Sequence, residues 1–175
     1  LIATREMLLI EAEMKRRGMI AEQSPITPIW KPNPGPQTEA MKSEAFEVYF
    51  GGSAGGGKTE IAIGLALTQH RKSIIFRREY PQLKEVVDRS KELLQNTNAR
   101  FNGQLMLWRG IPGGRQLEFG ACQHEDDKSR YQGRPHDLKA FDEISAFSES
   151  QYRFLIGWAR SIQKGQRVRV IACGN

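Results

Sequence analysis

The sequence predicts an α/β fold in which a mainly parallel sheet is covered by helices on both faces. Two observations carry this prediction. From residue 46 to the end of the chain, short apolar runs that suit strands alternate with stretches of helical periodicity. The first of these runs leads into a helix through a glycine-rich loop, a junction typical of strand–loop–helix units in parallel sheets.

Length and composition fit one soluble domain. A chain of 175 residues, 39% hydrophobic and 26% charged, builds a core without disulfide or metal staples. No apolar run approaches the roughly 20 residues that cross a bilayer, so we expect no membrane partner. Residues 1–17 are too acidic and too periodic for a signal peptide. The chain starts at Leu1 instead of Met, and we expect that earlier residues were removed or are missing.

Cysteine, histidine and charge give weaker indications. Cys122 and Cys173 lack metal-ligand spacing and the three histidines are scattered, which favours a reduced, intracellular protein. The net charge is +6 and the isoelectric point is near 9.5, which favours contact with a polyanion. A merely basic, soluble surface explains this charge equally well, because the basic residues are spread along the chain.

The first 37 residues form a separate unit in our prediction. Residues 3–17 show helical spacing, with basic residues in the last turn and Gly18 as the cap. Residues 24–37 contain five prolines and are expected to form an extended strap. We therefore divide the chain into residues 1–37 and a core of residues 38–175 that opens with a short helix at 38–43.

After this short helix, the periodicity of the core predicts four strands, three further helices and one hairpin. The hairpin joins residues 105–108 to residues 116–119 through Ile-Pro-Gly-Gly at 111–114. The expected strands are residues 46–50, 73–76, 138–141 and 167–173, and the expected helices are residues 59–69, 83–94 and 149–160.

The glycine-rich loop matches the phosphate-binding pattern G-x-x-x-x-G-K-[ST] in full. Glycines let several main-chain N–H groups approach an anion, and the following helix adds its positive dipole end. This pattern assigns Lys58 to the β and γ phosphates and the Thr59 hydroxyl to Mg²⁺. A glycine-rich turn that carries Lys-Thr by chance is the alternative, and the strand before and helix after argue against it. The nucleotide-binding residues are Gly52, Ser53, Ala54, Gly55, Gly56, Gly57, Lys58 and Thr59.

Two carboxylates, Asp142 and Glu143, follow the apolar run at 138–141. Such a pair taken alone is usually a solvated turn. Downstream of a phosphate loop, however, the first acid typically holds Mg²⁺ and the second activates the attacking water. The sequence therefore predicts an Mg²⁺-dependent ATPase, with Asp142 as a metal ligand and Glu143 as the catalytic base.

Further stretches resemble the terminase large subunits, the ATP-driven motors that pump viral DNA into preformed capsids. Pro-Gly-Pro-Gln at 34–37 is similar to the segment in which a glutamine reads adenine, which implies this role for Gln37; a polar residue at a helix start is the alternative. Ile-Ala-Cys-Gly-Asn at 171–175 resembles the strand and turn that sense the γ-phosphate. Asn175 is thereby implied as the sensor, with a simple strand-end turn as the alternative. Residues 76–83 and 129–133 also resemble family segments.

This resemblance runs from about residue 30 to the last residue and has definite implications. The fold would be a P-loop NTPase of the RecA/ASCE type, a three-layer sandwich to which the N-terminal helix and hairpin are additions. The sensing strand would lie between the strand of the phosphate loop and the acidic strand. The protein would use ATP and Mg²⁺ to translocate double-stranded DNA, as a homo-oligomeric ring working with the portal and the small terminase subunit in the host cytoplasm.

The resemblance leaves the arginine that completes the site unassigned. Some terminases carry an arginine inside the phosphate loop and others carry one where this chain has Gln132. We favour Arg130 or Arg134, acting in cis or from a neighbouring subunit, because their loop adjoins the acidic strand. For every candidate a surface salt bridge is the alternative. The full set is Arg77, Arg78, Arg130, Arg134 and Arg160.

Three expectations remain open. In the family further strands and a nuclease domain follow the sensing strand, whereas this chain ends there, so we expect a truncated core without nuclease activity. A helicase or recombinase motor is the first alternative, and stimulation by single strands instead of duplex would reveal it. A nucleotide-dependent assembly module that does not hydrolyse ATP is the second, and the presence of Glu143 argues against it.

Overall fold

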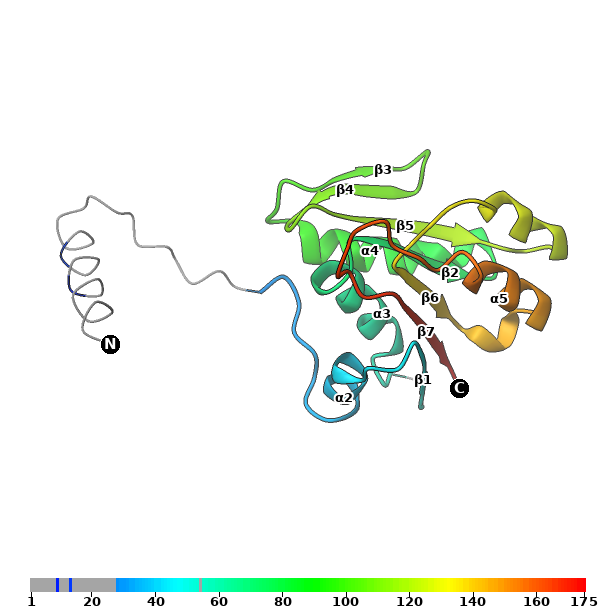
Figure 1. Cartoon of the computed structure of the whole chain (residues 1–175), viewed down its shortest axis with the longest axis horizontal. Helices are drawn as coiled ribbons and strands as arrows, with labels where there is room; N and C mark the ends of the chain where they lie inside the picture. Colours follow the sequence, from blue (N-terminus) through cyan, green and yellow to red (C-terminus); the bar gives the residue numbers. More distant parts are fainter. Residues whose placement is uncertain (1–8, 10–12, 14–27, 54) are drawn as a thin grey trace.

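The computed structural model describes residues 9, 13, 28–53 and 55–175 (Figure 1). The predicted helix at 3–17 and part of the predicted strap lie outside the described residues, apart from residues 9 and 13. Ala54 of the phosphate loop is also outside them. Within the described residues no helix has the length and apolarity that a membrane crossing requires.

A seven-stranded sheet in the order β1-β7-β6-β2-β5-β4-β3 forms the centre of the fold (Figure 1). The first five strands in this order, β1, β7, β6, β2 and β5, are parallel. β4 then pairs antiparallel with β5, and β3 pairs antiparallel with β4. β7 lies between β1 and β6, as the resemblance implies for the sensing strand. The strands are β1 (Glu47–Gly51), β2 (Lys72–Arg77), β3 (Arg100–Asn102), β4 (Leu107–Ile111), β5 (Arg115–Ala121), β6 (Leu138–Asp142) and β7 (Arg169–Gly174).

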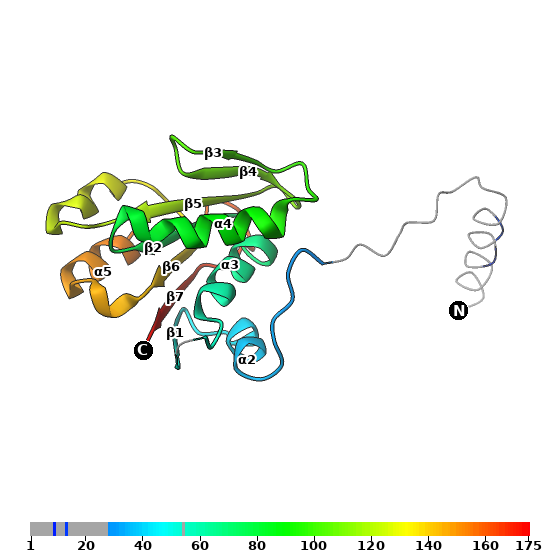
Figure 2. The ribbon, with the colours of Figure 1, turned by 180° about the vertical axis from the view of Figure 1, so that it is seen from behind.

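Helices cover both faces of this sheet (Figures 1 and 2). α3 packs on β2, β5, β6 and β7, and α4 lies beside α3 over β5. α5 packs with η2 on the opposite face. The helices are α2 (Pro36–Lys42), α3 (Lys58–Thr68), α4 (Leu83–Leu94) and α5 (Glu149–Ile156), with 3₁₀ turns η1 (Tyr80–Gln82), η2 (Glu125–Tyr131) and η3 (Ile144–Ala146).

The pleat of the central strands explains why two apolar layers form. In β2, Ile74 and Phe76 face the cluster beneath α5, whereas Ile75 between them faces the cluster beneath α3. Successive side chains of a strand point to opposite faces, so a strand that is apolar at every position is buried on both sides. This observation confirms the predicted three-layer α/β sandwich.

The structure corrects several element boundaries. α5 ends at Ile156 instead of residue 160, because a turn through Gly157 and Trp158 replaces its last turn. β3 is a three-residue strand that was not predicted, because its sequence Arg-Phe-Asn contains no apolar run. β5 belongs both to the predicted hairpin and to the parallel sheet, so the hairpin extends the sheet.

The expected short helix at 38–43 begins earlier, at Pro36, a residue type that the first turn of a helix tolerates. Gln37 therefore belongs to this first turn instead of the extended strap. The expected boundary between residues 37 and 38 accordingly falls inside α2.

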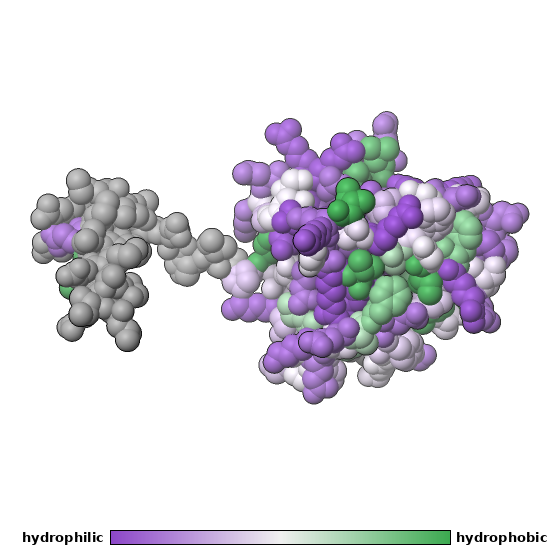
Figure 3. Space-filling model, in the orientation of Figure 1, coloured by the Kyte–Doolittle hydropathy of each residue, from purple (hydrophilic) through white to green (hydrophobic). Residues whose placement is uncertain are grey.

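The surface is largely hydrophilic. Figure 3 shows that hydrophilic residues form most of the rim of one face, while hydrophobic residues appear in small groups. The exposed large hydrophobic side chains within residues 28–53 and 55–175 come from four segments, two of them in or next to β1: Phe46, Tyr49, Tyr80, Leu105 and Ile162.

Candidate functional site

The phosphate loop leaves β1 at Gly51 and enters α3 at Lys58. Gly55 and Gly57 have φ angles of 80° and 72°, in the left-handed region that favours glycine. A Cβ atom on Gly57 would lie 2.1 Å from the Gln37 Nε2 atom. The backbone angle therefore favours glycine at position 57, and a side chain there would also displace the Gln37 amide.

Lys58 is folded back onto its own loop and is only 8% exposed. Its Nζ atom donates to the main-chain oxygens of Gly52, at 2.8 Å, and Ser53, at 3.1 Å. The first N–H groups of α3 have no partner inside the helix, as at every helix N-terminus. A buried cation beside these N–H groups forms a site suited to an anion.

The acidic strand end lies in direct contact with the phosphate loop. The Thr59 hydroxyl donates to Asp142 Oδ2 at 2.9 Å. Arg77 Nε and Nη2 lie 2.8 Å and 2.7 Å from the same oxygen. Parallel pairing of β2 with β6 sets Phe76 beside Phe141, so the next residue of each strand, Arg77 and Asp142, also meet. The two sequence motifs thus form one site.

One oxygen of Asp142 has no partner among the described residues. The Asp142 side chain is 1% exposed, and its Oδ1 atom makes no hydrogen bond within residues 28–53 and 55–175. A buried, unpaired carboxylate oxygen is costly, and a hydrated cation would satisfy it. Among the described residues no group of three or more His, Cys, Asp and Glu side chains forms a metal cage. One carboxylate and one hydroxyl suit Mg²⁺, which keeps several waters and takes its other ligands from phosphates.

Glu143 follows Asp142 in a strained conformation. Its φ and ψ angles are 62° and 59°, in the left-handed region, which costs a residue with a Cβ atom on the order of 1 kcal/mol or more. Within the described part of the chain, its carboxylate makes no hydrogen bond or ion pair. The half-buried carboxylate is therefore available to a water or ligand.

Asn175 closes the site from the end of β7. Its Oδ1 atom accepts a hydrogen bond of 2.5 Å from Lys58 Nζ, and its main-chain oxygen accepts one from the Tyr49 hydroxyl. Beneath it, the Cys173 thiol donates to the Lys58 carbonyl at 3.3 Å. Burial, with a smaller contribution from Asp142, raises the pKa of this thiol well above its usual range. Cys173 is thus an uncharged part of the core.

Gln37, in the first turn of α2, is hydrogen-bonded to the phosphate loop. Its Oε1 atom accepts from the Asn33 N–H at 2.7 Å, and its Nε2 atom donates to the Gly57 carbonyl at 3.0 Å. A hollow of about 600 Å³ lies beside it, lined also by Trp30 and Glu60. Gln37 therefore has one amide hydrogen and one lone pair left for a ligand.

The two arginines favoured by the sequence lie outside this site. Arg130 pairs with Asp127 at 3.1 Å, and its side chain is 68% exposed. Arg134 pairs with Glu118 at 2.6 Å and precedes the amino end of β6, whereas the loop follows the carboxyl end of β1, which runs in the same direction. A role in a neighbouring subunit's site stays a prediction for both.

The other three candidate arginines have different positions. Arg78 donates to Gln151 of α5, and Arg160 stacks over the Trp158 ring at 4.9 Å. Only Arg77 reaches the acidic pair, and the sequence did not single it out. Arg77 follows a predicted strand, as Asp142 does. This position indicates a contact between the two residues only when β2 is known to pair with β6.

We expect Arg77→Ala to lower the free energy of unfolding by about 3 kcal/mol in Mg²⁺-free buffer, because it leaves the Asp142 carboxylate buried with Thr59 as its one remaining partner among the described residues. Urea denaturation measures this loss. Adding Asp142→Asn removes the buried charge and should restore part of the stability. Strictly additive losses in the double mutant would contradict the pairing.

The chain is similar to known proteins in sequence and in fold. The family model described as "Terminase large subunit, T4likevirus-type, N-terminal" matches residues 49–174. No curated protein matches the chain. Residues 49–174 contain the phosphate loop, the acidic pair and all seven strands except the first two residues of β1.

Several solved structures share the fold. The large terminase of the thermophilic bacteriophage D6E superposes with a TM-score of 0.62 at 12% identity, covering 83% of this chain and 39% of that one. The large terminase of bacteriophage HK97 gives 0.58 at 10% identity, with coverage of 79% and 31%. The D6E protein has also been solved with ADP, at a TM-score of 0.60 and 15% identity over 79% of this chain and 38% of that one. This chain thus spans about two fifths of the D6E protein's length.

Proposed function

Because the chain belongs to the terminase large subunit family, in its T4likevirus-type N-terminal region, we propose that it is the ATP-hydrolysing motor domain that drives double-stranded DNA into a procapsid. One observation carries the proposal. Thr59 of the phosphate loop is hydrogen-bonded to Asp142 of the acidic strand end, at 2.9 Å. This contact joins a triphosphate site to a metal-binding carboxylate. The related D6E structures with ADP and with ATP-gamma-S support the choice of ligand.

The triphosphate lies along the loop in this proposal. The main-chain N–H groups of residues 52–59 and the α3 N-terminus bind its oxygens, and Lys58 turns from the Gly52 and Ser53 carbonyls to the β and γ phosphates. The adenine enters the hollow that Gln37 lines, and the Gln37 amide has one hydrogen and one lone pair left for it. Gly52, Ser53, Ala54, Gly55, Gly56, Gly57, Lys58 and Thr59 form the nucleotide site.

The Thr59 hydroxyl and the Asp142 carboxylate would hold Mg²⁺, and the unpaired Oδ1 of Asp142 fits this role. The bound metal supplies positive charge to the phosphate oxygens. Glu143 orients the attacking water and accepts its proton, since its carboxylate has no competing partner among the described residues. Asn175, in contact with Lys58, senses the γ-phosphate.

Assembly completes the proposed mechanism. Arg130 or Arg134 of an adjacent subunit in a homo-oligomeric ring neutralises the charge that develops on the transferred phosphoryl group. The ring works with the portal and the small terminase subunit in the host cytoplasm. Both arginines are exposed and paired with acids of their own chain, so either must leave its present partner to act in trans.

Measuring the ATPase rate per chain across protein concentrations, with and without duplex DNA, tests the proposal. We expect the rate per chain to rise with concentration and to rise again with duplex, because assembly supplies the arginine. The Lys58→Ala protein controls for contaminating ATPases. Stimulation by single strands alone would favour a helicase-like motor. Tight ATP binding without hydrolysis under every condition would favour an assembly module.

A further inference from the structure

Two neighbouring hollows of about 270 Å³ each lie at the amino ends of β2, β5 and β6. The phosphate loop lies at the other end of the parallel strands, after the carboxyl end of β1. Arg71, Lys72 and Arg160 line the first hollow, and Lys72, Arg109 and Arg134 line the second. Lys72 opens β2, whereas Arg77 at the other end of this six-residue strand reaches the nucleotide site. The two regions are therefore separated by about 17 Å along the strand.

All five basic side chains are exposed. Arg134 is paired with Glu118. The other four, Arg71, Lys72, Arg109 and Arg160, make no ion pair with a carboxylate in the part of the chain that the structure describes. Unpaired, exposed cations around two adjoining hollows create a positive potential over this end of the strands.

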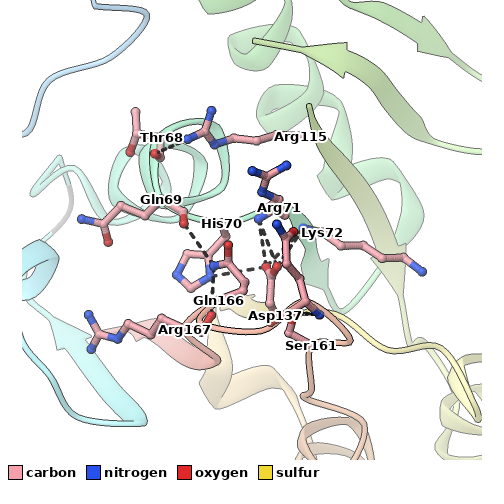
Figure 4. Close-up of polar contacts among 11 residues, drawn as sticks. Thr68, Gln69, His70, Arg71, Lys72, Arg115, Asp137, Ser161, Gln166 and Arg167 are labelled. Carbon is pink, nitrogen blue, oxygen red and sulfur yellow. Dashed lines mark hydrogen bonds and ion pairs between the residues drawn. The ribbon is translucent and has the colours of Figure 1, made fainter. Parts of the chain in front are cut away.

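The two acids in the hollows do not cancel this charge at the surface. Asp137 is 2% exposed, and its carboxylate accepts hydrogen bonds from the main-chain N–H groups of Arg71 and Lys72 at 3.1–3.2 Å (Figure 4). His70 Nδ1 lies 3.4 Å from it. Asp137 thereby fixes the backbone from which the side chains of Arg71 and Lys72 project, as Figure 4 shows.

Glu118, in the second hollow, is 7% exposed and contacts Arg134 at 2.6 Å and His136 at 3.2 Å. These two partners offset the negative charge of Glu118. The exposed lining therefore combines cations with polar groups such as Gln116, which both hollows share, and with the apolar Ile162 in the first hollow.

We propose that these two hollows, here called the basic edge, bind the phosphate backbone of duplex DNA. The inference rests on the proposed function, since a motor for DNA needs a grip outside its nucleotide site. The lining of the two hollows, within the described residues, holds lysine and arginine but no Phe, Tyr or Trp on which a base could stack. Such a lining suits phosphate contacts, which position a duplex without reading its sequence. A translocating motor requires such contacts, because it must hold every stretch of DNA equally well.

The triple variant Arg71→Gln, Lys72→Gln, Arg109→Gln tests the basic edge. Its matched control is Lys42→Gln, Lys84→Gln, Lys91→Gln, which removes the same formal charge from exposed side chains elsewhere. Affinity for two unrelated 30-base-pair duplexes is measured by fluorescence anisotropy at several salt concentrations. Thermal melting and the affinity for a fluorescent ATP analogue verify that each variant is folded.

We expect the basic-edge variant to bind both duplexes at least about tenfold more weakly at 0.1 M salt. The slope of log affinity against log salt should fall by about 2 to 3, close to 0.9 for each lost phosphate contact. Nucleotide affinity and ATPase without DNA should not change, because the edge lies across the sheet from the loop.

Other results overturn the inference. Equal losses in both variants would show a general charge effect instead of a site. Unchanged DNA binding with altered self-association, measured by sedimentation, would make the basic edge a contact between subunits. In both cases the proposed ATPase would stand if Lys58→Ala still abolished turnover, so the two proposals fail separately.

Discussion

Replacing Lys58 with alanine is expected to abolish ATP turnover and to weaken nucleotide binding by about 100-fold. The buried Nζ atom sits within the loop, with its contacts at 2.5–3.1 Å. Hydrogen bonds between charged groups contribute about 1.5–3 kcal/mol each, and the loss of one or two of them to phosphate corresponds to this factor. Titration with a fluorescent ATP analogue and assays of phosphate release measure both effects.

Lys42→Ala is the matched control for this substitution, since it removes an exposed lysine from α2. The control should bind and hydrolyse ATP like the unmodified protein. Thermal melting separates lost binding from lost folding, because Lys58 also holds Asn175. Undiminished nucleotide affinity in a folded Lys58→Ala protein would contradict the role assigned to the loop.

The second large effect is expected from Glu143→Ala, which should lower turnover by about 10²- to 10⁴-fold, the usual contribution of a general base. Nucleotide affinity should stay within a few-fold of the original. The carboxylate has no structural partner among the described residues, so its loss should leave the phosphate loop unchanged. Single-turnover hydrolysis and the same nucleotide titration give the two values.

Two further substitutions at this position refine the interpretation. Glu143→Gln retains the shape but not the basicity, so it should be as inactive as Glu143→Ala. Glu143→Gly relieves the left-handed conformation at φ 62° and should be more stable than Glu143→Ala by about 1 kcal/mol. Substantial hydrolysis by both Glu143→Ala and Glu143→Gln would remove this residue from the role of base.

Sequence patterns predicted the core of the site because its chemistry depends on local spacing. The loop at residues 52–59 and the pair Asp142-Glu143 each occupy consecutive positions. Alternating strands and helices then imply a parallel sheet whose carboxyl ends meet. The structure brings the two motifs within one hydrogen bond, from Thr59 to Asp142. The catalytic roles themselves stay predictions.

The remaining features depend on which strands become neighbours, which a single sequence does not specify. Arg77 acquires its partner Asp142 only through the pairing of β2 with β6. Arg134 lies next to the acidic strand in sequence but before its amino end, so it pairs with Glu118 on β5. Arg134 was favoured because it is close to Asp142 in sequence. It lies before the amino end of β6, however, and the acidic pair lies at the carboxyl end, so Arg134 does not reach the site of its own chain.

The basic edge was hidden from the sequence for the same reason. Lys72, Arg109 and Arg160 are far apart in the chain and form no charge cluster in sequence. Sheet order brings the start of β2, the hairpin and the segment after α5 to one edge. A basic composition alone predicted a polyanion without locating it.

A crystal structure with Mg²⁺ and a slowly hydrolysed ATP analogue tests the central claim most directly. The account predicts the triphosphate against the N–H groups of residues 52–59, with Lys58 on its terminal phosphates and the metal between Thr59 and Asp142. A nucleotide bound at any other place, with Lys58 still held by Gly52, Ser53 and Asn175, would contradict it.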